Sequence, residues 1–467
     1  MPPRPDARWG QNAWYHAAWG AAQSGAAMST IQTYQQALDY IYSFIDAARK
    51  AAESPEAADR NLARMRALLA AVNDPQAAFP CVVVAGTKGK GSTAAMIEAI
   101  ARAAGLRTGL FSSPHLSSYR ERMQVDREPI TQDELVALTA LLRPAIDACD
   151  PEPNGRPTTF DISLLLALCH FAARGVQLAI MEVGLGGRYD AVNSLTPLVS
   201  VISSISYDHM AILGPSLHGI AWNKAGIIKP DIPAVTVPQP AEAAPVLAAE
   251  ARTVGAELWV ADEGGVRLAV GAAAPPLRAY PVEPAPALRG GFQRENARLA
   301  LGAALLLREH GLHLPDAALA AGLACVAWPA RFELIASTPP VLIDGAHNGD
   351  SALKLVAAIR AELAPERMLL ILGTSRDKDV AAIAAALVPE AAAVILTRSR
   401  HHRAMDIDRI VAEVGLHLRG PLVITADVGA ALSAARELAS PADLICITGS
   451  LFVAAEAREA LGLAVPD

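Results

Sequence analysis

The sequence predicts two α/β domains, the second of them doubly wound in the Rossmann manner. Three observations support this prediction. The chain has 467 residues, about three times the length of a typical domain, so more than one hydrophobic core is expected. Short apolar runs alternate with helical patterns from residue 81 onward, as in sheets covered by helices. A second regular alternation of this kind begins after residue 331.

The first domain is predicted to begin with helices and to continue into a sheet. From residue 30 to about residue 71, apolar residues recur at three- and four-residue spacing, which is typical of amphipathic helices. The apolar run 81–85 indicates a buried strand, and a glycine-rich turn and a small-residue helix follow it. Further buried strands and helices are expected at 178–184, 198–204, 160–173 and 243–254.

The second domain is predicted to start at a boundary near 326–333. The domains then span 30–328 and 329–467, and residues 1–29 form a flexible extension. The Pro/Ala-rich part at 271–289 is expected to be a surface loop. Amphipathic helices separate the strands of the second domain, which indicates a parallel sheet with crossover helices. These strands are expected near 341–344, 368–372, 393–397, 422–425 and 443–448.

Composition excludes several kinds of partner. Hydrophobic residues make up 52% of the chain, but no uninterrupted apolar stretch is long enough to span a bilayer. The formal net charge of −7 argues against nucleic acid, which needs a basic face. The five cysteines lie far apart and form no C-x-x-C pair, which indicates reduced thiols in the cytoplasm.

The turn at 86–93, Gly-Thr-Lys-Gly-Lys-Gly-Ser-Thr, has the features of a phosphate-binding loop. Its glycines let successive backbone N–H groups face one anionic ligand, and the following helix adds its positive end. Lys90 supplies a point charge. The standard G-x-x-x-x-G-K-[ST] loop is not met, because Val84 stands at the first glycine position and Gly91 separates Lys90 from the serine. Such a turn can also be purely structural, but its two lysines and Ser-Thr pair favour a phosphate site.

Two groups of metal-competent side chains follow predicted strands. Glu182 ends one strand, and Asp208-His209 follows another, so both are expected at the carboxyl edge of the sheet, where α/β proteins bind ligands. Oxygen ligands, above all carboxylates, suit Mg²⁺. A lone Glu or His at a strand end is usually only a polar boundary residue. Two such groups at the edge that carries a phosphate loop favour a metal site.

Several motifs in order resemble the folylpolyglutamate synthase/dihydrofolate synthase family of Mur ligases. The turn at 86–93 resembles the ATP loop of that superfamily, with Lys88 where asparagine is common. The other similar motifs are Ser112-Ser-Pro-His-Leu116, Glu182-Val-Gly-Leu-Gly-Gly-Arg188, Asp190-Ala-Val-Asn193, Asp208-His209 and Lys224-Ala-Gly-Ile-Ile-Lys-Pro230. The resemblance runs from about residue 30 to about residue 460.

The resemblance implies roles for residues of the first domain. Glu182, His209 and one serine of the 112–113 pair would hold Mg²⁺, with Ser113 preferred over Ser112. Lys224 would be carbamylated and help to place a second Mg²⁺, although a lysine on a helix near phosphates explains the same residue. The ATP contacts would be Gly86, Thr87, Lys88, Gly89, Lys90, Gly91, Ser92, Thr93 and Asn296. The acceptor contacts would be Thr158, Thr159, Phe160, Asp161, Arg188, Asp190 and Asn193. Thr158 or Thr159 is equally suited to be a helix N-cap.

The resemblance also assigns roles in the second domain. Arg331 would reach ATP phosphates, for which a guanidinium is suited because it makes forked, charge-assisted hydrogen bonds. Asp344 would contact ATP, and His347 would face the cleft between the domains. Lys90, Lys224 and His347 are the expected catalytic residues. For Asn296, which lies near the start of a predicted helix, a plain surface residue is the alternative.

The predicted activity is that of an ATP-dependent ligase with ATP bound between two domains. The carboxylate of a reduced folate or dihydropteroate would attack the γ-phosphate, and L-glutamate would displace phosphate from the acyl phosphate. The family implies a monomer. One alternative is another Mur-superfamily amide ligase; the peptidoglycan type normally has an additional N-terminal domain, for which the helices at 30–71 are too short. The other alternative is an inactive nucleotide-binding protein that has kept the fold.

Overall fold

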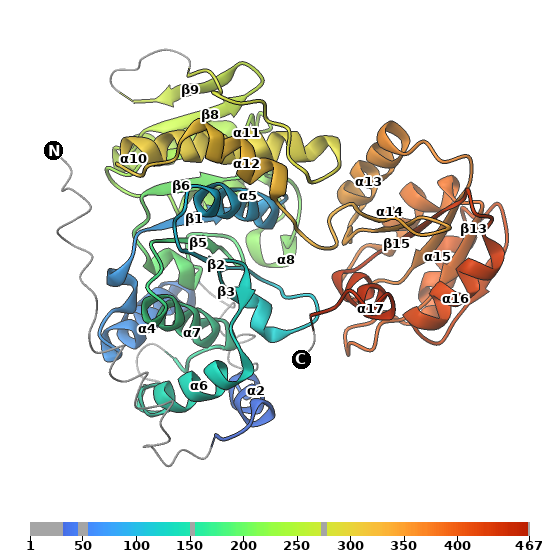
Figure 1. Cartoon of the computed structure of the whole chain (residues 1–467), viewed down its shortest axis with the longest axis horizontal. Coiled ribbons are helices and arrows are strands. Elements are labelled where there is room, and N and C mark those ends of the chain that lie inside the picture. The colour runs from blue at the N-terminus through green and yellow to red at the C-terminus, as the bar shows by residue number, and fades with distance from the viewer. Residues whose placement is uncertain (1–30, 45–54, 150–154, 272–277, 466–467) are drawn as a thin grey trace. The chain divides into compact units, whose positions relative to one another are not determined.

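The computed structural model describes residues 31–44, 55–149, 155–271 and 278–465, which form two compact units (Figure 1). The first unit comprises the chain up to His115 together with Arg120–Pro286 and Arg294–Val326. The second unit comprises Leu116–Tyr119, Ala287–Gln293 and Ala327–Asp467. The predicted extension at 1–29 lies outside the described residues.

Two helices precede the first sheet. α2 (Tyr34–Tyr42) begins at Thr33, whose side chain accepts from the backbone N–H of Gln36 while the Gln36 side chain accepts from the Thr33 N–H. This capping box satisfies two donors that a helix start leaves without partners. α4 (Pro55–Ala71) follows, and both helices fall within the stretch whose periodicity predicted helices.

The first unit is built on a nine-stranded sheet with the order β4-β3-β2-β5-β1-β6-β7-β8-β9. Neighbouring strands from β2 through β8 run parallel, and β3, β4 and β9 pair antiparallel at the edges. The strands are β1 (Cys81–Ala85), β2 (Thr108–Phe111), β3 (Met123–Val125), β4 (Glu128–Pro129), β5 (Leu178–Glu182), β6 (Val199–Ile202), β7 (Ala234–Thr236), β8 (Leu258–Asp262) and β9 (Gly265–Val270).

Helices cover both faces of this sheet. In Figure 1, α5 and α12 lie on one side of the strands and α4, α6 and α7 on the other. A Cβ on Gly322 of α12 would lie 2.5 Å from the backbone of Ile100 in α5, so glycine is what allows these helices to approach so closely. The helices of this unit after α4 are α5 (Lys90–Ala103), α6 (Gln132–Asp147), α7 (Thr159–Ala173), α8 (Met210–Leu213), α9 (Leu217–Ala225), α10 (Ala244–Val254), α11 (Gly291–Glu309, in this unit from Arg294) and α12 (Asp316–Cys325).

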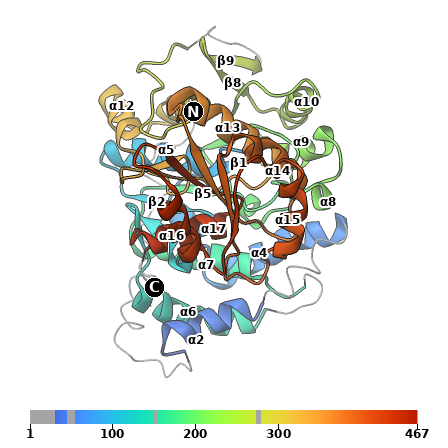
Figure 2. The same cartoon turned by 90° about the vertical axis from the view of Figure 1, so that its right-hand side faces the viewer.

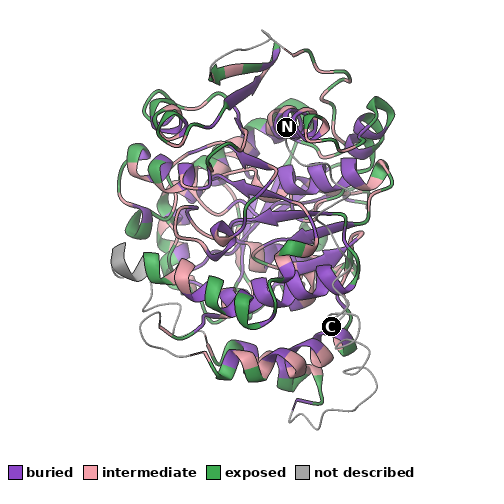
Figure 3. Cartoon of the chain, turned by 90° about the vertical axis from the view of Figure 1, so that its left-hand side faces the viewer, coloured by how far each residue is buried: buried purple, intermediate pink, exposed green. Residues whose placement is uncertain are grey.

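Burial explains why the central strands have continuous apolar sequences. Every residue of β1, β5 and β6 is buried, and Figure 3 shows buried strands between helices on both sides. A strand covered on both faces has mostly apolar side chains instead of apolar ones at alternate positions, and the buried polar exceptions here are Glu182 of β5 and Ser200 of β6. The α/β class expected from these runs is confirmed.

The second unit is a six-stranded sheet with the order β10-β11-β15-β12-β13-β14, in which only the β10–β11 pair is antiparallel. Side chains alternate between two cores: Leu370 and Leu372 of β12 face one, and Leu369 and Ile371 face the other. The strands are β10 (Glu333–Ile335), β11 (Val341–Ile343), β12 (Met368–Leu372), β13 (Ala393–Leu396), β14 (Leu422–Ile424) and β15 (Leu444–Thr448).

Each core of the second unit is closed by its own set of helices. α13 (Gly349–Glu362), α14 (Val380–Leu387) and α15 (Ile407–Gly415) cover one face. α16 (Val428–Leu438) and α17 (Leu451–Ala460) cover the other face (Figure 2). This is the doubly wound arrangement that the alternation after residue 331 predicted. Across the described parts of both units, the helices are too short or too polar to cross a membrane.

Candidate active site

Three segments with predicted site residues meet at the carboxyl edge of the first sheet. Val84 of β1 is paired in register with Glu182 of β5, and Ala85 is paired with Ile202 of β6. The turn after β1, the end of β5 and the segment after β6 therefore emerge side by side. From β1 the chain goes to β2 and β5 on one side of β1, and it then crosses to β6 on the other side of β1. Sheets of this kind bind ligands where the strand order reverses in this way.

The turn after β1 requires glycine at two positions. Gly86 has φ +143°, and a Cβ there would lie 1.9 Å from Ser203 Oγ. Gly89 has φ +87°, and a Cβ there would lie 2.2 Å from Asn296 Oδ1. Gly89 is also the N-cap of α5. The predicted ATP contact Asn296 is thus packed against the start of the helix that would receive phosphates.

We expect Gly89→Ala to weaken nucleotide binding and to raise the Kd by about tenfold or more. The new methyl group must displace either Asn296 or the turn. Gly105→Ala is the matched control, since Gly105 directly follows the C-cap of the same helix, has φ +85°, and a Cβ there would meet nothing within 4 Å. Both changes place alanine in the left-handed region, at a cost of about 1–2 kcal/mol. Isothermal titration with an ATP analogue checks this, and equal losses in the two variants would contradict it.

Two lysines converge on one carbonyl oxygen of this turn. Lys224 Nζ donates to Gly86 O at 2.7 Å, and Lys90 Nζ donates to the same oxygen at 3.2 Å. Lys224 lies on α9 and is buried. Burial, and then the nearby charge of Lys90, hold the pKa of Lys224 well below the usual lysine range. This shift moves Lys224 toward the neutral, nucleophilic amine relative to an exposed lysine. Lys90 lies at the first turn of a helix that attracts anions.

Oxygen donors for a cation lie at the same edge of the sheet as these lysines. The Glu182 carboxylate is buried at the end of β5, and its Oε2 accepts from the Ser113 backbone N–H at 3.3 Å. Among the described residues no three His, Cys, Asp or Glu side chains form a metal-binding group. A cation here would thus need hydroxyl, water or phosphate oxygens as well. That donor set fits Mg²⁺, which is commonly bound by one or two carboxylates together with substrate phosphates.

His209 follows Asp208 after β6 and has a left-handed backbone, with φ 51° and ψ 36°. Its side chain is half exposed, and its backbone N–H donates to Asp208 Oδ1 at 3.0 Å. Lys88, the third residue of the turn at 86–93, forms an ion pair of 2.9 Å with the other oxygen of Asp208. The predicted metal ligand His209 is thus connected to the phosphate loop through Asp208.

The predicted acceptor contacts at the start of α7 form a local network. Thr158 Oγ1 accepts from the Asp161 N–H, and Asp161 Oδ2 accepts from the Thr158 N–H. Thr158 is therefore the helix N-cap that the sequence suggested as its alternative role. Arg64 and Asp161 form an ion pair of 2.7 Å whose side chains are each only 3% exposed. Thr159 Oγ1 donates to Ile41 O.

Phe160 lies against a glycine of the neighbouring predicted acceptor segment. A Cβ on Gly184 would be 2.7 Å from the Phe160 ring, and the Phe160 and Phe111 rings pack edge to face with centroids 5.6 Å apart. Such edge-to-face pairs are a favoured aromatic geometry. The structure thus brings Phe160 next to the segment that leads from Glu182 toward Asp190.

Arg188, Asp190 and Asn193 hold the loop after β5 together. Asp190 accepts from the N–H groups of Leu185 and Val192 at 2.9 and 3.0 Å. Asn193 Nδ2 donates to Arg188 O at 2.8 Å. The Arg188 guanidinium pairs with Glu250 at 2.7 Å and lies 4.1 Å from the centre of the Trp222 ring. Burial raises the pKa of Asp190 to about 7, although the two backbone N–H groups oppose the rise.

This shift predicts how stability depends on pH. The folded pKa of Asp190 is about 7 and the ordinary value is 3.8, so between these pH values the folded chain keeps a proton that the unfolded chain releases. Its contribution to stability is complete below about pH 4 and is lost as the pH rises to 7, by up to about 1.4 kcal/mol per pH unit. Urea unfolding should therefore show Asp190→Asn gaining stability relative to the wild type from pH 5 to pH 7. A difference that does not change with pH would contradict this.

The predicted residues of the second unit surround the end of β11. Asp344 is buried, and its carboxylate accepts from the N–H groups of Phe332 and Ala346 at 2.7 and 2.8 Å. Burial raises the pKa of Asp344, and the charge of Arg331 opposes the rise. A Cβ on Gly345 would lie 2.5 Å from Arg331 Nη1, and His347 Nδ1 is 2.8 Å from Gly345 O. Arg331, Asp344 and His347 are thus brought together within this unit.

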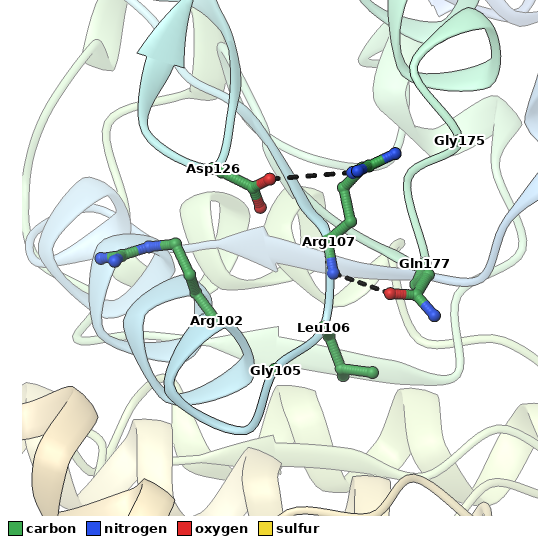
Figure 4. Close-up of a pocket in the computed structure, with 7 residues that line it drawn as sticks. All are labelled: Arg102, Gly105, Leu106, Arg107, Asp126, Gly175 and Gln177. Atoms are coloured by element: carbon green, nitrogen blue, oxygen red, sulfur yellow. Dashed lines mark hydrogen bonds and ion pairs between the residues drawn. The ribbon is translucent and has the colours of Figure 1, made fainter.

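A cavity of about 540 Å³ lies at the opposite edge of the first sheet (Figure 4). Arg107 immediately precedes β2 and Gln177 immediately precedes β5, and the Arg107 N–H donates to the Gln177 side chain at 2.8 Å. The cavity therefore faces the amino ends of the strands. None of the predicted site residues lines it.

Three contacts that shape the site were not predicted from the sequence. Ser203 packs against Gly86, Asp208 pairs with Lys88, and Arg64 pairs with Asp161. The position of Ser203 directly after a buried strand was a usable signal, because that strand end had to lie at the ligand-binding edge. Arg64 gave no such signal, since its partner lies 97 residues away in the sequence.

Two family models match the chain. The Mur ligase middle domain matches residues 84–230, and the Mur ligase glutamate ligase domain matches residues 330–451. Dihydrofolate synthase/folylpolyglutamate synthase from Bacillus subtilis is 37% identical over 327 residues, which is 68% of this chain and 76% of the relative.

Solved structures extend the similarity over most of the chain. Mycobacterium tuberculosis folylpolyglutamate synthase complexed with ADP and AMPPCP has a TM-score of 0.76 and 32% identity, covering 87% of this chain and 96% of that one. A bifunctional folylpolyglutamate synthase/dihydrofolate synthase with Mn, AMPPNP and L-glutamate bound has a TM-score of 0.72 and 29% identity, covering 86% of this chain and 94% of that one. The chain therefore belongs to the folylpolyglutamate synthase/dihydrofolate synthase family of Mur ligases, which are ATP-dependent ligases.

Proposed function

We propose that this enzyme joins L-glutamate to the carboxylate of dihydropteroate and of reduced folates, with conversion of ATP to ADP and phosphate. The main support is the convergence of Lys90, Lys224 and the Glu182 strand end at one edge of the first sheet. The Bacillus subtilis relative is named for both activities. The Mycobacterium tuberculosis structure contains ADP and AMPPCP, and the bifunctional synthase contains Mn, AMPPNP and L-glutamate.

The chemistry requires cations where two anions meet. A carboxylate oxygen of the acceptor attacks the γ-phosphorus of ATP and ADP leaves, which gives an acyl phosphate. The glutamate amine then attacks the acyl carbon, inorganic phosphate leaves, and the amine nitrogen loses a proton. We assign Lys90 and the first turn of α5 to the phosphates, because a point charge and a helix N-terminus both offset developing negative charge. Ser113, Glu182 and His209 would hold Mg²⁺, which would neutralise phosphate charge.

Lys224 is proposed to carry a carbamate. A neutral lysine amine adds to CO₂ and loses one proton, which turns a cationic side chain into an anionic oxygen donor. Burial of Lys224 and its lowered pKa support this reaction. The resulting carboxylate would help to hold a second Mg²⁺ beside the first turn of α5.

The other predicted site residues are assigned according to the hydrogen bonds and contacts around them. Thr158, Thr159, Phe160 and Asp161, together with Arg188, Asp190 and Asn193, are proposed to line the acceptor site. Asn296 packs against Gly89 and is proposed to contact the nucleotide. In the second unit, Arg331 and Asp344 are proposed to act on ATP and His347 on the reacting groups.

We also propose domain limits of 30–328 and 329–467, and a monomeric enzyme that works in the cytoplasm. The main boundary between the compact units, at Val326 and Ala327, supports the domain limits. The free thiols of Cys81, Cys325 and Cys446 suit a reducing compartment.

Product mass tests the function directly. The enzyme is incubated with ATP, Mg²⁺ and L-glutamate, and separately with dihydropteroate or tetrahydrofolate as the acceptor. Addition of one glutamyl residue to each acceptor, with one ADP formed per addition, is the expected result. Addition to only one of them would reduce the proposal to a single activity. No glutamyl product with either acceptor would refute it.

A further inference from the structure

The phosphate loop is joined to the segment after β6 by a series of hydrogen bonds. The N–H groups of Thr87 and Lys88 both donate to Ser204 O, at 2.9 and 3.1 Å. Thr87 Oγ1 donates to Ser206 O at 3.1 Å. The ion pair between Lys88 Nζ and Asp208 Oδ2 extends this series by one more contact. The first part of the loop therefore holds the neighbouring segment, and the later part forms the start of α5.

Lys88 directs both its backbone N–H and its ammonium group to this segment. The Lys88 and Asp208 side chains are 17% and 13% exposed, so water and salt screen their attraction less than they screen a surface pair. Replacing Lys88 by a neutral residue would remove this ion pair from a carboxylate that is partly buried. Loss of one partner of such a pair usually costs more than the pair itself contributes.

The Asp208 carboxylate contacts both Lys88 and His209. While Oδ2 accepts from Lys88, Oδ1 accepts from the His209 N–H at 3.0 Å. That N–H belongs to a residue in the left-handed region, at φ 51° and ψ 36°, which costs a non-glycine residue about 1–2 kcal/mol. The Asp208 carboxylate therefore connects Lys88 of the phosphate loop to the strained backbone of His209.

We propose that Lys88 is a positioning residue that acts through Asp208 to hold the turn presenting His209, rather than a phosphate contact. What His209 binds rests on the proposed function, in which it is a ligand of the nucleotide-bound metal. The link makes the geometry of the metal ligand depend on the phosphate loop. Loss of Lys88 should accordingly weaken the metal-dependent part of nucleotide binding and leave the metal-independent part almost unchanged.

A double-mutant cycle tests this with the full-length protein. Lys88→Met, Asp208→Asn and the double variant are titrated with AMPPNP, once with Mn²⁺ and once with EDTA, and bound Mn²⁺ is followed by electron paramagnetic resonance. Each single change should raise the Kd in Mn²⁺ about tenfold, and the double change should add little more, because both remove the same link. The Kd in EDTA should change less than about twofold. Lys88→Arg should keep most of the binding.

Two results would overturn the inference. Additive losses in the double variant would show that Lys88 and Asp208 act independently. An equal loss for Lys88→Met in EDTA would make Lys88 a phosphate contact. If Lys88→Met does not fold, Asp208→Asn breaks the same link from the other side and must by itself reproduce the Mn²⁺-specific loss. Because the readout is binding and not glutamyl transfer, failure of the proposed activity would be recognised separately.

Discussion

Lys90→Met is expected to lower kcat for ADP formation by about 10²–10³-fold, the usual effect of removing a group that stabilises transition-state charge. Lys90 is the first residue of α5, and its ammonium group lies over Gly86 O at 3.2 Å. Methionine keeps the length and the apolar stem of the side chain but removes the charge. The loss should therefore be in turnover, with little change in thermal stability.

Lys354→Met provides the control for this variant. Lys354 is half exposed on α13 and pairs with Asp350 four residues earlier at 3.2 Å, an arrangement that contributes only a few tenths of a kcal/mol. Its turnover should equal that of the wild type. Rates are compared in a coupled ADP assay at saturating acceptor and glutamate, and the melting temperature of each variant is measured alongside. Turnover of Lys90→Met within about threefold of the wild type would remove Lys90 from the catalytic residues.

The features predicted best were those in which sequence and environment agree over several residues. β1, β5 and β12 are buried along their whole length, so their continuous apolar runs identified them. The helices α7 and α10 were located within one residue at their starts and ends. The strand-end residues could be grouped because carboxyl ends of parallel strands share an edge. The Gly86 turn and Glu182 were placed together on that argument, and Val84 is indeed paired with Glu182.

Short or edge elements gave no comparable signal. β7 has three residues and β4 has two, too few for any period to appear. β9 is an edge strand. The antiparallel pairing of β3 and β4 depends on a turn in which Asp126 and Arg127 both have positive φ. These features are decided by tertiary packing and by turn geometry, which apolar spacing does not encode.

The sequence also could not identify side-chain partners that lie far apart along the chain. The sequence suggested that Lys88 adds a cation beside phosphates, while its partner in the structure is Asp208, 120 residues later. The same holds for Arg64 and Asp161. A charged residue in a loop has several oppositely charged candidates in the sequence, and only the fold selects among them. The class of site could therefore be predicted better than the contacts within it.

Lys224→Met is expected to reduce turnover by about 10²–10³-fold and to abolish carbamate formation. The amine of Lys224 is buried, and its pKa is lowered first by that burial and then by the Lys90 charge. The lowered pKa shifts Lys224 toward the neutral amine that adds CO₂, relative to an ordinary exposed lysine. With ¹³CO₂, the wild type should show a carbamate carbon resonance that the variant lacks. Lys354→Met again controls for general loss of a lysine, since Lys354 is half exposed on α13 and pairs only locally with Asp350 at 3.2 Å.

Depletion of CO₂ separates the modification from the lysine itself. Degassed, bicarbonate-free wild-type enzyme should lose activity and regain it when bicarbonate is added. Lys224→Met should be indifferent to both, because it has no amine to modify. Formate added to Lys224→Ala supplies a small carboxylate where the long side chain has been removed, and it should restore part of the turnover. A wild type that keeps full activity without CO₂ and shows no carbamate resonance would mean that Lys224 acts as an unmodified amine, whose hydrogen bond to Gly86 O then shapes the phosphate loop directly.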